Sequence, residues 1–272
     1  MTIGLFIGVA IAALLAEYMD ASIGMGYGTT LTPLLLIVGF APLDVVPAVL
    51  LGQLAGGVVG GYFHHRLGNI HLDFRHDGKL AQKNGYRFSY IPRSLDAKVI
   101  LTLAVCGVVG AIIGVLVAIN IPAIALRVYI GVMVTAIGLA ILVWRNHQSP
   151  FSFQRLVGVG LLSAFNKGVS GGGYGPLVTG GQVLSGRETR NSVGSTTVAE
   201  IAVTAIGFTS YTVFKGGLSW LLVAAVSIGS ITAGPLAAHT VKRLGSRKLK
   251  LVVGLAIIVL GLWSLAEALL FA

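Results

Sequence analysis

Two glycine-rich stretches have residue types and spacing suited to binding a small anion. The first reads Ser-Ile-Gly-Met-Gly-Tyr-Gly from Ser22 to Gly28, and the second reads Ser-Gly-Gly-Gly-Tyr-Gly-Pro from Ser170 to Pro176. Each glycine costs a helix about 1 kcal/mol, so unwound backbone is expected in both stretches. Unwound backbone and helix N-termini present N–H groups that bind anions. No strand is expected before either stretch and no Gly-Lys-Ser/Thr follows, which argues against a nucleotide-binding loop.

An anion between the two stretches would be held chiefly by backbone amides, because several amides can converge on different oxygens of one oxyanion. Hydroxyl and side-chain amide groups would complete the site, and Lys167 would add positive potential. The alternative is that the glycines only permit tight turns and close helix packing. The candidate substrate-binding residues are Ser22, Gly24, Gly26, Tyr27, Gly28, Asn166, Lys167, Ser170, Gly171, Gly172, Gly173, Tyr174, Ser195 and Thr196.

Ionisable residues inside apolar segments are a second kind of candidate, because an ionised side chain at the centre of a bilayer costs roughly 2.5–3.5 kcal/mol. Glu200 lies well inside an apolar segment, where burial favours its neutral form. Asp20 lies just before the first glycine-rich stretch. We expect these two residues to be candidates for carrying a coupling proton. The alternatives are a packed Glu200 with no coupling role and an Asp20 that only neutralises Lys167.

The sequence predicts no metal, no cofactor and no catalytic constellation, so an enzyme is not expected. The histidines at 64, 65, 71 and 76 share a strongly basic stretch that would repel a metal ion. We expect a solvated loop there, with binding of an anion or an anionic lipid as the alternative. Cys106 is the single cysteine and lies in an apolar run, which excludes an intramolecular disulfide and a multi-cysteine metal site.

Apolar segments of membrane-spanning length must position these residues. Of 272 residues, 55% are hydrophobic and 10% are charged, against roughly 25% charged in a soluble domain. Because lipid tolerates only helices and closed barrels, and no segment alternates like a barrel strand, the fold is expected to be all-α and polytopic. Ten apolar segments are expected, near 3–20, 22–39, 44–63, 98–118, 122–144, 154–168, 171–185, 191–212, 217–239 and 249–270.

The two halves of the chain resemble each other. An offset of 147 residues superposes the two glycine-rich stretches, aligns Asp20 with Lys167 and aligns Gln53 with Glu200. Later in the chain, an offset of 123 aligns Gly131 with Gly254. We predict two inverted five-segment repeats, one at 1–145, which includes a basic loop at 64–97, and one at 146–272. The alternative is that each glycine-rich pair forms one interrupted span, which gives eight spans.

The basic residues predict an orientation in the cell (plasma or inner) membrane. All 19 except Arg127, Lys167 and Lys215 lie near 64–98, 145–155, 186–190 and 240–250. Short cytoplasmic loops carry the excess of Lys and Arg, so these regions are expected inside and both termini outside. The net charge of +10 is therefore not a sign of nucleic-acid binding. The expected partners are a small anionic substrate and the lipid bilayer, with a homodimer as a further possibility.

The glycine-rich stretches, each followed by a proline and an apolar run, resemble the TauE/SafE sulfite exporter family, as does Asn-Ser-Val-Gly-Ser-Thr-Thr from Asn191 to Thr197. The resemblance covers nearly the whole chain and implies two related halves and transport of sulfite, sulfonates or related small anions. Met25 stands where the family prefers glycine, and the basic loop from about 71 to 97 looks longer than usual. With no ATPase motif in the chain, we expect a secondary transporter that works by alternating access. An anion channel with the same site is the alternative.

Overall fold

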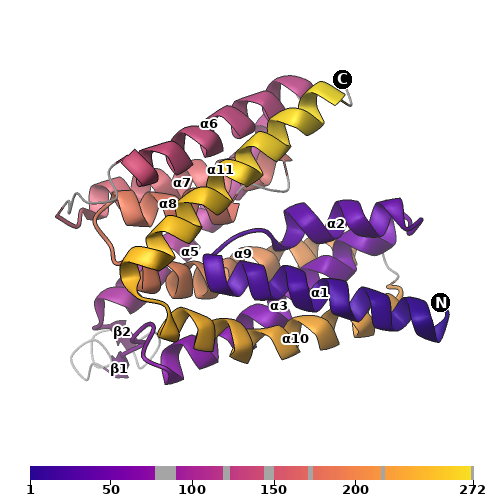
Figure 1. The fold of residues 1–272 in the computed structure, drawn as a ribbon, viewed down its shortest axis with the longest axis horizontal. Coiled ribbons are helices and arrows are strands. Elements are labelled where there is room, and N and C mark those ends of the chain that lie inside the picture. Colours follow the sequence, from indigo (N-terminus) through magenta and orange to yellow (C-terminus); the bar gives the residue numbers. More distant parts are fainter. Residues whose placement is uncertain (77–89, 119–122, 144–149, 171–173, 216–217, 271–272) are drawn as a thin grey trace.

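The computed structural model describes residues 1–76, 90–118, 123–143, 150–170, 174–215 and 218–270. The described residues form ten helices, and each overlaps one of the ten expected apolar segments (Figure 1). The helices are α1 (Ile3–Ile23), α2 (Tyr27–Ile37), α3 (Pro42–Arg66), α5 (Leu95–Ala118), α6 (Ala123–Val143), α7 (Phe153–Ser170), α8 (Tyr174–Leu184), α9 (Thr189–Lys215), α10 (Trp220–Arg243) and α11 (Ser246–Leu270).

Several helices have the length and surface of membrane spans. By length and composition, three described helices can cross a bilayer: α1, α3 from Asp44 to Arg66, and α10. Large apolar side chains project outward from α1, α5, α10 and α11, where a soluble protein would carry charge. The 11-residue helices α2 and α8 are too short to cross alone, because a span needs about 20 residues.

Helices from the two halves of the sequence are interleaved. Helices α1 and α3 from the first half pack against α10 from the second half. Helix α3 also packs against α9, and α5 packs against α7 and α9. Helices α6 and α11 run side by side across the upper part of Figure 1, while α1, α3 and α10 lie together below them. The two halves therefore share one helical core.

Small residues allow these helices to approach closely. A Cβ atom added to Gly234 of α10 would lie 2.8 Å from the backbone N of Gly60 on α3. A Cβ atom added to Gly110 of α5 would lie 2.7 Å from the Cβ of Ala164 on α7. Such contacts stabilise helix pairs where lipid supplies no hydrophobic driving force.

The basic loop differs from its expected form in two respects. It contains a two-stranded antiparallel sheet of β1 (Phe74–His76) and β2 (Tyr90–Pro92), in which Arg75 is opposite Ile91, so the chain is not wholly α-helical. In addition, α3 continues to Arg66, and His64 is fully buried rather than solvated. The ring Nε2 of His64 lies 2.9 Å from the carbonyl oxygen of Ala21. Because a carbonyl only accepts, Nε2 carries the proton, and Nδ1 accepts from the Asn69 amide at 3.1 Å.

Candidate functional site

The first glycine-rich stretch is a helix break, as its composition predicts. Helix α1 ends at Ile23 and α2 begins at Tyr27. Gly24 and Gly26 have φ angles of 85° and 119°, a region that L side chains rarely adopt. The N–H of Gly24 donates to the carbonyl of Asp20 at 2.6 Å and closes the end of α1. The expected unwound backbone therefore spans Gly24 to Gly26.

A carboxylate from the chain itself occupies the N-terminus of α2. The backbone N–H of Tyr27 donates to Oδ1 of Asp20 at 3.1 Å, and both residues are buried. A helix N-terminus stabilises negative charge, so Asp20 caps α2 in the way an external anion would. The structure thus gives Asp20 a local role, while proton coupling through it stays a prediction.

The start of α8, which follows the second glycine-rich stretch, lies directly against the first helix break. Helix α7 ends at Ser170 and α8 begins at Tyr174, one repeat offset after the corresponding ends of α1 and α2. A Cβ atom added to Gly175 would lie 2.6 Å from the carbonyl oxygen of Gly24 and 2.8 Å from the Cα of Met25. The first break and the start of α8 are therefore in backbone contact. Gly171, Gly172 and Gly173 lie outside the described residues, as do the side chains of Asn166, Lys167 and Ser170.

The Thr179 hydroxyl lies at this contact, and residues beside the first break supply two more hydroxyl groups. Oγ1 of Thr179 lies 3.0 Å from the carbonyl oxygen of Gly24 and 2.9 Å from Oγ1 of Thr196. One hydroxyl hydrogen serves one acceptor at a time, so Thr179 donates either to the Gly24 carbonyl or to Thr196 on α9. The hydroxyl of Tyr27 lies 2.7 Å from Oγ of Ser230, and Ser22 donates to the carbonyl of Met19 at 3.3 Å.

The remaining candidates lie on or beside α8 and α9. Tyr174, Ser195, Thr196 and Glu200 are buried, and Oγ of Ser195 has no hydrogen-bond partner among the described residues. Gly28 is next to open space, since a Cβ atom added there would have no neighbour within 4 Å. Of these residues, Thr196 is connected to the first helix break through Thr179.

A polar network that sequence reasoning missed continues from Thr196 away from the breaks. Gln182 on α8 donates through Nε2 to Oγ1 of Thr196 at 2.9 Å and accepts from Arg187 through Oε1 at 3.2 Å. Arg187 also forms a buried ion pair with Asp96 at the start of α5. The backbone N–H of His71 donates to Asp96 at 2.7 Å. Hydrogen bonds thus connect the basic loop to the helix breaks.

Arg187 has a structural role that its place among the basic residues did not predict. We expected residues 186–190 on the cytoplasmic side, which stays a prediction, and the structure shows that Arg187 is buried and paired. Burial lowers the pKa of its guanidinium, and the neighbouring Asp96 carboxylate opposes that shift. A pair separated by 91 positions leaves no local signal in the sequence.

A third buried carboxyl group joins the two that sequence analysis selected. Glu17 on α1 is 1% exposed and lies within electrostatic range of Asp20 and Glu200. A Cβ atom added to Gly56 of α3 would lie 2.6 Å from Cδ of Glu17, so the glycine makes room for the carboxyl group. Oε2 of Glu17 has no hydrogen-bond partner among the described residues. Within the part of the chain that the structure describes, no group of side chains is arranged to hold a metal ion.

Comparisons with known proteins agree with a membrane transporter. Residues 87–264 match the family described as sulfite exporter TauE/SafE. A curated relative, the "Probable membrane transporter protein YtnM" of Bacillus subtilis (strain 168), is 25% identical over 259 residues, which cover 90% of this chain and 77% of the relative. No solved structure matches the chain significantly.

Proposed function

Because the chain belongs to the sulfite exporter TauE/SafE family, we propose that it is a secondary transporter of a small sulfur-containing oxyanion, such as sulfite or a sulfonate. The membrane-transporter relative and the apolar surface of the helices support a multi-pass membrane transporter. The identity of the substrate and its route through the protein are our proposals. Transport in either direction, export or import, fits this proposal.

The observation that carries the site is the backbone contact between the first helix break and the start of α8. In the first repeat, Asp20 already neutralises the N-terminus of α2. The residue at the same repeat position before α8 is Lys167, so the sequence supplies a cation where the first repeat supplies a capping anion. We therefore place the oxyanion at the N-terminus of α8, with the hydroxyl groups of Thr196 and Ser195 as candidate contacts and Lys167 as a source of positive potential.

Two features support inverted repeats and alternating access. Helices α7, α8 and α9 end or begin 147 positions after the matching ends of α1, α2 and α3, at Ser170, Tyr174 and Thr189. The packing is also exchanged between repeats, because α1 packs on α10 as its counterpart α7 packs on α5. Such an arrangement allows bundles that combine helices from both repeats to rock against each other around a central site.

Flux measurements test the function directly. Full-length protein in liposomes is expected to move sulfite with slow, saturable kinetics and to be accelerated by a pH gradient. Glu200→Gln should remove the acceleration by the pH gradient and leave substrate binding largely intact. The amide keeps the shape of the side chain but cannot bind and release a proton. Unchanged proton dependence in the variant would assign Glu200 a packing role. A large ion conductance without saturation would favour a channel.

Chemical labelling tests the proposed orientation. In a Cys106→Ala background, Gly245→Cys should react with a membrane-impermeant maleimide only from the cytoplasm, since it follows the basic end of α10. Trp220→Cys, at the exposed opposite end of the same helix, should react only from outside. The reverse pattern would invert the orientation, and labelling of both from one side would show that α10 does not cross the membrane.

A further inference from the structure

A groove separate from the helix breaks opens on the surface between α1, α3 and α10. Its volume is about 550 Å³. The walls are apolar and include Phe63, Leu67, Pro235 and Leu236, whereas one end carries His239 and Arg243. The groove therefore combines an apolar trough with a cationic end, a pattern suited to an amphipathic molecule.

The apolar trough is continuous with the outer surface of the helices. Leu236 on α10 is 52% exposed, and Ile228 and Ile231 on the same helix are also exposed, as is Leu15 on α1. Both α1 and α10 have the length and composition of a membrane span. The trough thus opens toward the acyl chains of the bilayer rather than toward a water-filled cavity.

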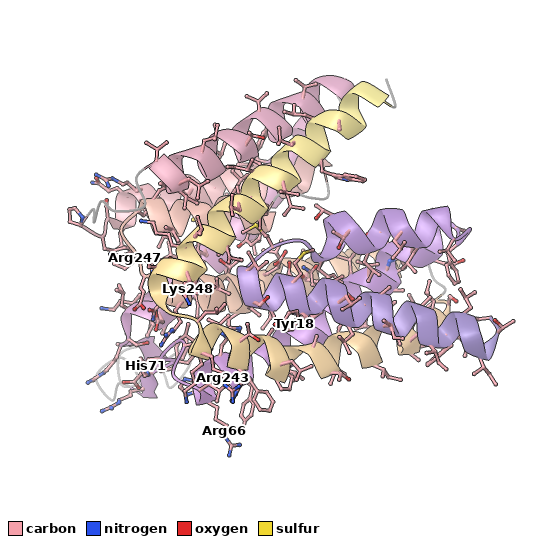
Figure 2. The ribbon with its side chains drawn as sticks, in the orientation of Figure 1. Tyr18, Arg66, His71, Arg243, Arg247 and Lys248 are labelled. Atoms are coloured by element: carbon pink, nitrogen blue, oxygen red, sulfur yellow. The ribbon has the colours of Figure 1, made fainter. Side chains whose placement is uncertain are left out.

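The cationic end lies at the last turn of α10, at the depth of the lipid headgroups if α10 spans the bilayer. Lys242 and Arg243 are exposed there, and Arg66 is exposed in the last turn of α3, which packs against α10. Figure 2 shows the side chains of Arg66 and Arg243 projecting from this end of the bundle. Within the described part of the chain, none of these three cations forms an ion pair.

The hydroxyl groups inside the groove are already satisfied. Tyr18 on α1 and Thr240 on α10 lie 2.8 Å apart and hydrogen-bond each other, and Thr240 also lies 3.1 Å from the carbonyl of Leu236. This hydrogen bond joins the two walls without a ligand. The groups in the groove that remain for a ligand are therefore the positive charges at its end and the apolar surface next to them.

We propose that this groove is a binding site for an anionic glycerophospholipid. The phosphate lies at Arg243 and His239, with Arg66 and Lys242 adding positive potential, and one acyl chain lies along Leu236 and Phe63. Basic pockets between membrane helices recognise anionic headgroups in this way. The site does not depend on which anion the protein transports.

Lipid titration of the purified full-length protein, followed by native mass spectrometry, tests the site. Phosphatidylglycerol is expected to bind on the order of 100-fold more tightly than phosphatidylcholine with the same acyl chains, because each of the three nearby cations contributes about fivefold, or roughly 1 kcal/mol. Arg243→Gln should weaken phosphatidylglycerol binding about fivefold. The matched control is Arg247→Gln, which removes another exposed arginine at the start of α11 (Figure 2) and should change binding less than about twofold.

A second variant separates the groove from general surface charge. Leu236→Trp fills the trough without changing charge, and it should also weaken phosphatidylglycerol binding. Soluble glycerol phosphate at the same concentration should not displace the lipid, because it lacks the acyl chains. Equal effects of Arg243→Gln and Arg247→Gln, equal binding of the two lipids, or dimers that dissociate when Leu236→Trp is introduced would each overturn the proposal.

Discussion

Gly175→Val is expected to abolish substrate flux while the protein still folds. A Cβ atom at this position would lie 2.6 Å from the Gly24 carbonyl oxygen and 2.8 Å from the Met25 Cα, so backbone rather than a flexible side chain must move. The start of α8 and the first break would separate, and the amides that we propose bind the oxyanion would no longer converge. Hydrogen bonds to a charged group contribute about 1.5–3 kcal/mol each, so losing two weakens binding by at least about 100-fold.

The control for this variant is Gly158→Val on α7. Gly158 is exposed, and a Cβ atom there would have no neighbour within 4 Å. Both substitutions add the same side chain to a helix, so they share any effect of valine on helix stability. Sulfite flux in liposomes, together with circular dichroism and size-exclusion chromatography in detergent, compares them. If folded Gly175→Val had the flux of the wild-type protein, the substrate site could not lie at the contact between the first helix break and the start of α8.

Local patterns in the sequence account for most of the helix arrangement. The ten apolar runs predicted where helices would form, because burial and helical hydrogen bonding in lipid leave few alternatives. The glycines at Gly24 and Gly26 predicted the break because their composition opposes a helix at that point. The offset of 147 that superposes the two glycine-rich stretches also relates the start of α8 to the start of α2. These features depend on residues that are neighbours in the chain, so they can be predicted from one sequence.

Features that depend on distant residues were predicted poorly. His64 was assigned to a solvated loop because its neighbours in sequence are basic, but Ala21 and Asn69 bury it. The capping role of Asp20 depends on the position of the first residue of α2 after the break, because the N–H of Tyr27 must reach the Asp20 carboxylate. Glu17 was not selected as a candidate, because the space that Gly56 provides for its carboxyl group is visible only when α1 and α3 are packed together. Tertiary contacts, rather than local propensity, set these positions.

The buried pair of Arg187 and Asp96 leads to the largest expected effect on stability. Both side chains are under 10% exposed, and Asp96 also accepts hydrogen bonds from the His71 N–H and from Asn191. Asp96→Ala leaves the Arg187 guanidinium buried without the carboxylate that pairs with it. Removing one partner of a buried pair lowers the free energy of unfolding by about 3–5 kcal/mol. In a protein of this length, that corresponds to a melting temperature lowered by roughly 6–20 °C.

An exposed pair in the same region provides the matched control. Asp73 and Arg75 lie 3.2 Å apart, with side chains 39% and 66% exposed, so Asp73→Ala should cost at most about 1 kcal/mol. The double variant Asp96→Leu, Arg187→Met should regain much of the loss, because it removes the buried charge along with its partner. Thermal unfolding in detergent compares the four proteins. Equal melting temperatures for Asp96→Ala and Asp73→Ala would contradict the assignment of this pair as a buried anchor between α5 and the α8–α9 connection.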